Sequence, residues 1–274
     1  MVDKSIISKS IDNAVLKCGN NYPKAQALRY YKEHKDNFKV EEYNGMDVTV
    51  KPSPVGNLQR LQAELQESID YTGLEKGVLH DYSTDSFIPL GMYLNNVPDW
   101  EEECEFIGYD FGDGFVMPVI DYDRLDSEGY TLPQYKDVGV RIDLSMPQES
   151  EMLSNMIDKS PRVQQDSIVY RYGDLPIDIQ VGEHGVIKSF QSTSYNEYVA
   201  FEDIAEGGTW IPTYDKNMVR YKQRIFVMEG TKGIVLNKHT GCMDWQSELL
   251  LDKGMRYVVL AKDDENLTAD ILVY

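Results

Sequence analysis

The chain has 274 residues, of which 27 are Lys or Arg and 46 are Asp or Glu, so its net charge is −19 at pH 7. Hydrophobic residues make up 42 % and aromatic residues 11 %, which excludes a disordered chain, and the length allows one large domain or two modest ones. The acidic balance also argues against a general binder of phosphate backbones, which needs a basic face.

The first third of the chain is expected to be mainly helical. Pro23 suits the first turn of a helix that continues through residues 24–35, and the stretch 51–56, with two prolines and a glycine, is typical of a linker. The clearest helix is predicted over 57–71, with Asn57 as its N-cap. Its expected apolar face consists of Leu58, Leu61, Leu65 and Ile69.

An acidic segment follows these helices. Residues 85–151 include sixteen acidic side chains and three basic ones. Such a segment is typical of a solvated face or an irregular insertion, and a docking surface for a basic partner is the alternative. We predict a helical extension over 1–56 and a main domain over 57–274 that contains an acidic insertion at about 75–148.

The second half of the chain is rich in strands. It begins with a helix expected over 150–160, and β-branched and aromatic runs follow, separated by Gly, Asn and Asp. These runs lie at 167–172, 185–193, 223–229, 233–237, 247–251, 255–261 and 269–274. Their length and spacing predict a mostly antiparallel sheet, and helices first with strands later predict an α+β architecture.

The sequence gives little support for a metal site or a membrane segment. The acidic run at 121–132 departs from a calcium loop, because Asp126 and Leu132 stand where Gly and Glu are needed, and the four histidines lack metal-ligand spacing. The N-terminus has no apolar signal-peptide core, the near-apolar run 87–94 is too short to span a bilayer, and only three scattered cysteines occur. We expect no bound metal, no membrane contact and a cytoplasmic location.

Three polar motifs lie in the strand-rich half. Arg171 stands inside an apolar strand, Ser192-Thr193-Ser194 follows Phe190, and Gln246-Ser247-Glu248 leads into a run of leucines. Taken singly, the arginine is typical of a structural ion pair, the serines of turn chemistry, and the Gln and Glu of a polar strand face.

Taken in this order and spacing, the motifs resemble the Arg…Ser-Thr-Ser…Gln-x-Glu arrangement of the mono-ADP-ribosyltransferases. The resemblance is to the toxin-like branch, which includes clostridial exoenzymes, binary actin-modifying toxins and transferases of tailed phages. It covers about 150–274 and extends to the helix at 57–71, but it does not cover 1–56 or 75–148. It implies N-terminal helices packed beside a mostly antiparallel two-sheet core.

The resemblance also implies a reaction and its cofactor. NAD would be the co-substrate, without a metal, and the bond between nicotinamide and its ribose would break through an oxocarbenium-like transition state. Glu248 would be the catalytic glutamate that accepts a hydrogen bond from the ribose 2′-hydroxyl. Ser192 would hydrogen-bond near Glu248, and Arg171 would bind NAD through its phosphates or ribose, which suits a planar guanidinium.

Further cofactor contacts are implied at five positions. Thr193 and Ser194 would support the active-site strand, and Phe201, or a nearby ring such as Tyr195 or Tyr198, would cover the nicotinamide. The family usually has glycine directly after the strand arginine. Here Tyr172 comes before Gly173, so we expect the backbone of Tyr172 and Gly173 to remake that contact.

Gln246 and Trp245 are implied to recognise the acceptor. In the family, a glutamate two residues before the catalytic one accompanies arginine as the acceptor, whereas glutamine accompanies asparagine-type protein targets and, in some members, nucleobases. An amide both donates and accepts hydrogen bonds, which suits another amide. We therefore expect ADP-ribose to be transferred to a target protein side chain other than arginine, and nucleic acid is the less favoured acceptor.

Three alternatives to this function stay open. An NAD glycohydrolase on the same scaffold would use water as the acceptor, and a nucleic-acid transferase would use a base. A non-enzymatic reading is an acidic inhibitor with a relic transferase fold, although the intact Arg171, Ser192 and Glu248 argue against it. The lack of a signal peptide suggests action in the cytoplasm of the producing cell, or of a target cell after injection.

Overall fold

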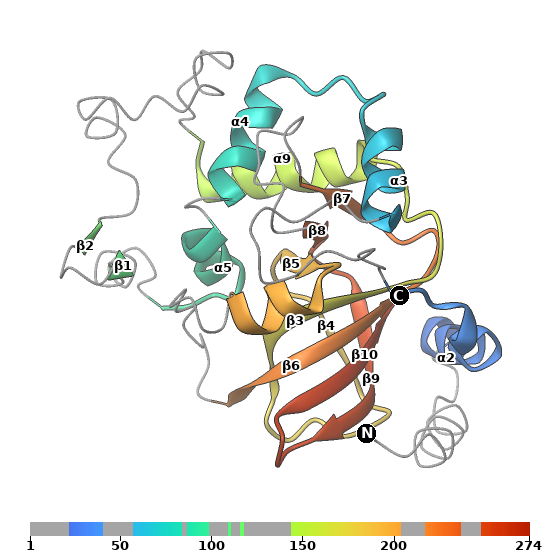
Figure 1. Ribbon diagram of the computed structural model, residues 1–274. Helices are drawn as coiled ribbons and strands as arrows, with labels where there is room; N and C mark the ends of the chain where they lie inside the picture. Colours follow the sequence, from blue (N-terminus) through green and yellow to red (C-terminus); the bar gives the residue numbers. More distant parts are fainter. Residues whose placement is uncertain are drawn as a thin grey trace.

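A computed structural model of the chain shows a two-layered β core with helices on both outer faces (Figure 1). The structure describes residues 22–40, 57–83, 87–98, 109–110, 116–117, 144–203, 217–236 and 248–274. None of the helices within these ranges is both long enough and apolar enough to cross a bilayer.

Eight strands form one hydrogen-bonded network in the order β4-β9-β10-β6-β3-β5-β8-β7. Their bounds are β3 (Ser167–Pro176), β4 (His184–Val186), β5 (Gln191–Ser194), β6 (Met218–Val227), β7 (Gly233–Val235), β8 (Glu248–Leu251), β9 (Arg256–Asp263) and β10 (Thr268–Val273). All neighbours are antiparallel except β10 and β6. Two short strands, β1 (Tyr109–Asp110) and β2 (Val116–Met117), pair separately. The α+β prediction is confirmed, and so are six of the seven predicted strand regions. The region predicted at 185–193 divides instead into two strands, β4 and β5, which are not neighbours in the sheet, and residues 187–190 belong to neither strand.

The network divides between β3 and β5 into a larger half (β4, β9, β10, β6 and β3) and a smaller half (β5, β8 and β7). A single residue pair, Tyr170 and Ser194, joins the two halves. Alternate residues of both halves meet in one buried cluster, in which Val169 and Ile225 of the larger half lie with Leu249 and Leu251 of the smaller half. The expected two sheets are therefore present as two packed layers. One detail differs from the prediction, because hydrogen bonds at this junction make the two layers one continuous sheet.

Helix α2 (Tyr22–His34) covers the outer face of the larger half (Figure 1). Leu28 and Tyr31 are buried against sheet residues such as Phe226, and a short 3₁₀ turn, η1 (Lys35–Asn37), follows. Lys39 then pairs with Ser167 at the start of β3. The helix predicted after Pro23 is confirmed, and its residues share a core cluster with the sheet. The expected linker at 51–56 lies outside the described residues.

Helices α4 (Gly73–Asp81), α5 (Phe87–Leu94) and α9 (Met146–Lys159) cover the outer face of the smaller half (Figure 1). Leu79 of α4 and Leu153 of α9 lie in one cluster with Leu250 of β8. The helix predicted over 150–160 is confirmed as part of α9, in which Leu153, Met156 and Ile157 are fully buried and Met152 is half-buried. Thr72 and Glu75 form a capping box that fixes the start of α4.

Helix α3 (Asn57–Gln66) corrects our expectation for 57–71. Leu61 and Leu65 are 42 % and 37 % exposed, and the buried face carries Gln59, Gln62, Ala63 and Gln66 instead. The helix ends at Gln66, and Asn57 is its first residue rather than the residue before it.

The reason for this inversion is the backbone of β7, which lies at the sheet edge. The Gln66 Nε2 atom donates to the Val235 carbonyl oxygen at 2.8 Å, and the Val235 N–H donates to Gln66 Oε1 at 3.0 Å. The Gln62 Nε2 atom donates to the Pro161 carbonyl oxygen at 2.6 Å. Buried backbone groups must be hydrogen-bonded, so this requirement outweighs the burial of two leucines.

We expect Gln66→Leu to destabilise the protein. The variant leaves both backbone groups of Val235 buried without partners, at a cost of about 1–3 kcal/mol for each group. Urea unfolding followed by circular dichroism measures the loss. The matched control is Leu65→Gln on the exposed face of the same helix, which we expect to change the free energy of unfolding by no more than about 0.5 kcal/mol. Equal stability of Gln66→Leu and wild type would contradict this account.

Candidate active site

The strand register brings Arg171, Ser192 and Glu248 together from β3, β5 and β8. Ser194 pairs with Tyr170 on one side and with Glu248 on the other, so the end of β5 lies between the interior of β3 and the start of β8. The Arg171 Nη1 atom donates to the Ser192 backbone oxygen at 2.5 Å. The structure thus unites one residue from each of the three motifs.

Glu248 is a buried carboxyl group, only 5 % exposed. The Ser192 side chain hydrogen-bonds the carboxyl, and Arg171 acts on it electrostatically. Its Oε1 atom is buried and has no hydrogen-bond partner in the described structure. Burial raises the pKa of Glu248 from its ordinary 4.5 to about 7, because Ser192 and Arg171 offset only part of the lost hydration.

Gly173 makes room for the arginine side chain. A Cβ atom at Gly173 would lie 2.8 Å from the Arg171 Nε atom, closer than the two atoms can approach. Gln223 lies opposite Arg171 on β6, and its Nε2 atom donates to the Gly173 carbonyl oxygen at 2.7 Å. Tyr172 points to the other face of the strand, where its ring lies 5.7 Å from the Arg220 guanidinium. Sequence reasoning singled out Gly173 but missed Gln223, whose only signal is a polar residue opening an apolar run.

Thr193 and Ser194 hold the strand in place through the protein itself. The Thr193 hydroxyl donates to the Leu249 carbonyl oxygen at 2.6 Å, and Ser194 Oγ accepts the Asn196 N–H at 3.0 Å. Both residues are almost completely buried. These bonds agree with a supporting role, and direct contact of either residue with a cofactor stays a prediction.

The three candidate rings for nicotinamide lie in different surroundings. Phe201, in the π-helical turn η3 (Val199–Asp203), packs edge-on against Tyr170 with ring centroids 5.6 Å apart. Tyr195 is 2 % exposed in the cluster between the two layers, so it offers no ring face to a ligand. Tyr198 is half-buried and follows the turn made by Asn196. A role for Phe201 or Tyr198 stays a prediction.

Tyr82 is a site residue that sequence reasoning missed. It ends helix α4, and its hydroxyl oxygen lies 3.4 Å from Ser192 Oγ. The capping box of Thr72 and Glu75 was a readable signal for helix α4. The placement of its last residue beside β5 depends on tertiary packing and has no sequence signal.

Gln246 and Trp245, the expected acceptor-recognition residues, lie outside the described residues. The acidic stretch 85–151 is described only in part, and there Glu149 is buried while Glu151 is exposed. Across the described ranges, no group of three or more His, Cys, Asp and Glu side chains is arranged to hold a metal ion.

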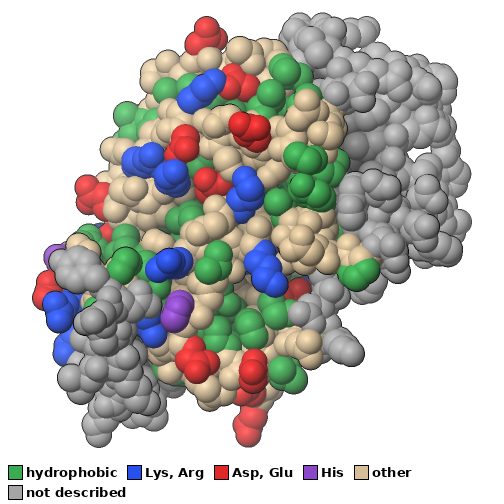
Figure 2. Space-filling view, turned by 180° about the vertical axis from the view of Figure 1, so that it is seen from behind, with side chains coloured by type: hydrophobic (Ala, Val, Ile, Leu, Met, Phe, Trp, Pro, Cys, Tyr) green, Lys and Arg blue, Asp and Glu red, His purple; other side chains and the backbone are tan. Residues whose placement is uncertain are grey.

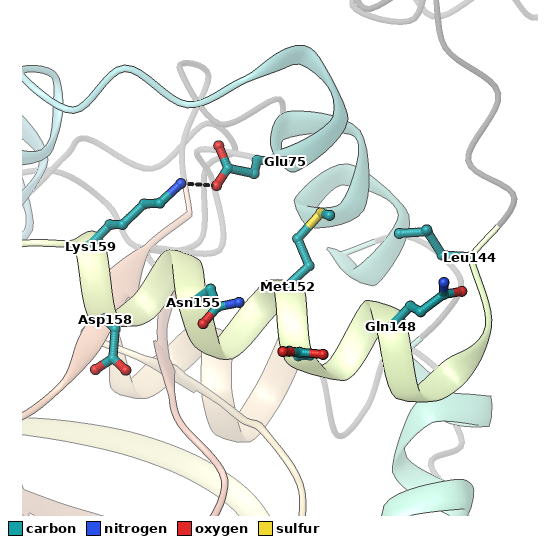
Figure 3. Close-up of a pocket in the computed structure, with 8 residues that line it drawn as sticks. Glu75, Leu144, Gln148, Met152, Asn155, Asp158 and Lys159 are labelled. Atoms are coloured by element: carbon teal, nitrogen blue, oxygen red, sulfur yellow. Dashed lines mark hydrogen bonds and ion pairs between the residues drawn. The ribbon is translucent and has the colours of Figure 1, made fainter.

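One cavity of about 590 Å³ is seen in Figure 3, and Glu248 is not among the residues that line it. Helices α4 and α9 form it, and its lining residues are Glu75, Leu144, Gln148, Glu151, Met152, Asn155, Asp158 and Lys159. The dashed line in Figure 3 marks the ion pair between Lys159 and Glu75. None of the motif residues contributes to this cavity.

Comparisons with known proteins give structural neighbours only. No family model matches the sequence, and neither does any curated protein. The fold resembles C3stau2 from S. aureus, solved with NAD, at 14 % identity and a TM-score of 0.47, covering 79 % of this chain and 92 % of that one.

Two further neighbours are ADP-ribosyltransferase toxins. Plx2a from Paenibacillus larvae is 10 % identical with a TM-score of 0.47 and the same coverages of 79 % and 92 %. The Vis toxin from Vibrio splendidus is 12 % identical with a TM-score of 0.44, covering 83 % of this chain and 89 % of that one. These similarities concern the fold, so the case for a function depends on the geometry around Glu248.

Proposed function

We propose that the protein is an NAD-dependent mono-ADP-ribosyltransferase. The observation that carries this proposal is the buried carboxyl of Glu248, which has Ser192 on one side, Arg171 in electrostatic range and a free oxygen, Oε1. A buried acceptor without a partner is costly, so such an atom is suited to a hydrogen-bond donor that a ligand brings. The ribose 2′-hydroxyl of NAD is a donor of this kind.

The chemistry follows from these positions. The bond between the ribose C1′ and the nicotinamide nitrogen breaks, and nicotinamide leaves with the electron pair. The ionised Glu248 carboxylate stabilises the positive charge that develops on the ribose, and this effect is strong in a dry site. The acceptor nucleophile then bonds to C1′ and loses its proton. Arg171 would bind the anionic oxygens of NAD, because its planar guanidinium suits paired hydrogen bonds to such oxygens.

We further propose a protein side chain other than arginine as the acceptor, on the basis of Gln246 two residues before Glu248. A nucleic acid is disfavoured by the net charge of −19. Lys and Arg side chains are also interspersed with Asp and Glu on the face shown in Figure 2, rather than gathered in a basic patch. The proposed setting is the cytoplasm of the producing cell or of an injected target cell.

NAD binding is expected to release up to about half a proton at pH 7, where a carboxyl with a pKa of about 7 is half protonated. Glu248 has a pKa of about 7, and the positive charge of the nicotinamide ring favours its ionised form. Titration calorimetry at pH 7 in buffers of different ionisation enthalpy counts this proton. Glu248→Gln has no proton to release at this position, so equal proton release by the variant and wild type would contradict the assignment.

The test of the function is labelling with biotinylated NAD in a bacterial lysate. Wild type should label a protein band that Glu248→Gln does not label, and mass spectrometry of that band identifies the acceptor residue. Gln246→Glu tests the acceptor, because a carboxylate there should weaken transfer to an amide while NAD cleavage continues. NAD consumption without a labelled product would favour the glycohydrolase, and an absence of both binding and turnover would overturn the proposal.

A further inference from the structure

The end of helix α4 places a tyrosine hydroxyl against the active-site serine. Tyr82 is 4 % exposed, and its ring packs edge-on against Phe190 with centroids 5.9 Å apart and planes at 74°. Its backbone N–H donates to the carbonyl oxygens of Leu79 and Val78, which fixes the residue at the helix end. The hydroxyl oxygen is therefore held at its position, 3.4 Å from Ser192 Oγ.

The direction of the hydrogen bonds follows from the available protons. A serine hydroxyl has one proton and can accept through its lone pairs. Ser192 also hydrogen-bonds the Glu248 carboxyl, and an ionised carboxylate only accepts. A tyrosine hydroxyl is the stronger acid, with a pKa near 10. The consistent order is donation from Tyr82 to Ser192 and from Ser192 to Glu248.

We propose that Tyr82 is a positioning residue of this site, whose hydroxyl donates to Ser192 Oγ and thereby directs the serine proton to the Glu248 carboxylate. The inference rests on the proposed function in so far as Glu248 is the catalytic carboxylate. Tyr82 acts through Ser192 and favours the ionised form of Glu248, because donors chained in this way strengthen one another.

Few other groups act on the carboxyl in the described structure. Arg171 on β3 is the charged group with an effect on Glu248, and Ser192 on β5 is the hydrogen-bonding group. Strand β7 and the described part of β5 carry no charged residue next to it. The side chains of His80 and Asp81 on α4 lie outside the description. Removal of the Tyr82 hydroxyl should therefore change the titration midpoint of the Glu248 carboxyl.

The chain supplies a matched control for this test. Tyr71, just before α4, makes the same kind of hydroxyl contact with Ser160 Oγ at 2.7 Å and belongs to the same buried cluster as Tyr82. Tyr71→Phe removes a tyrosine–serine contact of equal chemistry without touching Ser192. A general effect on the cluster of losing a buried tyrosine hydroxyl should therefore appear in both Tyr71→Phe and Tyr82→Phe.

The experiment titrates Glu248 by ¹³C NMR of carboxyl-labelled glutamate, with its signal assigned from Glu248→Gln. In Tyr82→Phe the midpoint should rise by about half a pH unit, in line with the loss of a modest stabilisation of the carboxylate. It should stay unchanged in Tyr71→Phe. Replacing Tyr82 with 3-fluorotyrosine keeps the size of the ring and makes the hydroxyl a stronger donor, so the midpoint should fall. In Ser192→Ala, the further change Tyr82→Phe should have no effect.

The kinetic result should follow the titration. The acidic limb of nicotinamide release against pH should move to higher pH in Tyr82→Phe by the same amount, with little change in KM. Equal midpoints in wild type, Tyr82→Phe and the fluorotyrosine protein would overturn the role of Tyr82, as would an equal shift in Tyr71→Phe. If wild type does not turn over NAD, the proposed function fails, while the carboxyl titration still decides the role of Tyr82.

Discussion

Glu248→Gln is expected to abolish NAD cleavage and, above pH 7, to make the folded protein more stable. The amide keeps the size of the side chain but cannot carry the negative charge that opposes the developing ribose cation. We expect nicotinamide release to fall by at least about 10²–10³-fold, as for the loss of a single preorganised electrostatic contact. NAD should still bind through Arg171, so the loss should appear in kcat more than in KM.

The stability gain follows from the pKa of Glu248. In the folded protein the pKa is about 7, above the ordinary 4.5 that the group regains on unfolding. The unfolded chain therefore loses this proton first as pH rises, and folding stability falls between about pH 4.5 and pH 7. The 2.5-unit difference corresponds to about 3 kcal/mol, and Gln removes up to that cost at pH 8.

Urea unfolding of both proteins at pH 8 and pH 5.5 measures this effect. The advantage of Glu248→Gln should be largest at pH 8 and clearly smaller at pH 5.5, which also stays above the isoelectric point of about 4.6. The matched control is Glu64→Gln on helix α3, which makes the same change at a side chain that is 61 % exposed. A constant difference between Glu248→Gln and wild type at both pH values would show that the carboxyl is ionised throughout.

Arg171→Lys is the second variant with a large expected effect. Lysine keeps the positive charge but loses the planar guanidinium that reaches the Ser192 backbone oxygen and that suits paired hydrogen bonds to an anion. Each hydrogen bond to a charged group is worth about 1.5–3 kcal/mol, so the dissociation constant for NAD should rise about 10–150-fold. Calorimetry or NAD-dependent thermal stabilisation measures this constant.

Arg220→Lys is the matched control for this change. Arg220 lies on the neighbouring strand β6 and binds Asp174 through two nitrogens, Nε at 2.9 Å and Nη2 at 3.2 Å. Arg220→Lys loses the same planar guanidinium as Arg171→Lys, but the partner of Arg220 is a carboxylate of the protein, Asp174. If both variants weaken NAD binding equally, the effect belongs to the sheet as a whole, and Arg171 has no special role.

The sequence allowed the strands to be predicted because their signals are local, whereas Arg171, Ser192 and Glu248 were singled out by the resemblance of their order and spacing to a known family. Alternating β-branched and aromatic runs place β3 to β10, and the strand register then brings Arg171, Ser192 and Glu248 together. The inverted face of α3 was not predictable in this way. Gln66 is buried because it hydrogen-bonds the backbone of Val235 in β7, which is 169 residues away in sequence.

The same reason explains the two site residues that were missed. Gln223 matters because it faces Arg171 across the β3–β6 ladder, and Tyr82 because α4 ends over β5. Both relations arise only when separate elements pack. A periodic pattern predicts which side of an element is buried. It does not predict which polar group on another element will need a hydrogen-bond partner.

The amide pairing of Gln66 has a consequence for behaviour at high protein concentration. An uncovered strand at the edge of a sheet is a template on which strands of other molecules can add, and this addition is a common route to aggregation. Gln66 occupies both backbone groups of Val235 on the outermost strand β7. We therefore expect α3 to limit the addition of other strands at β7, because the Gln66 amide makes the two hydrogen bonds that an added strand would make with Val235.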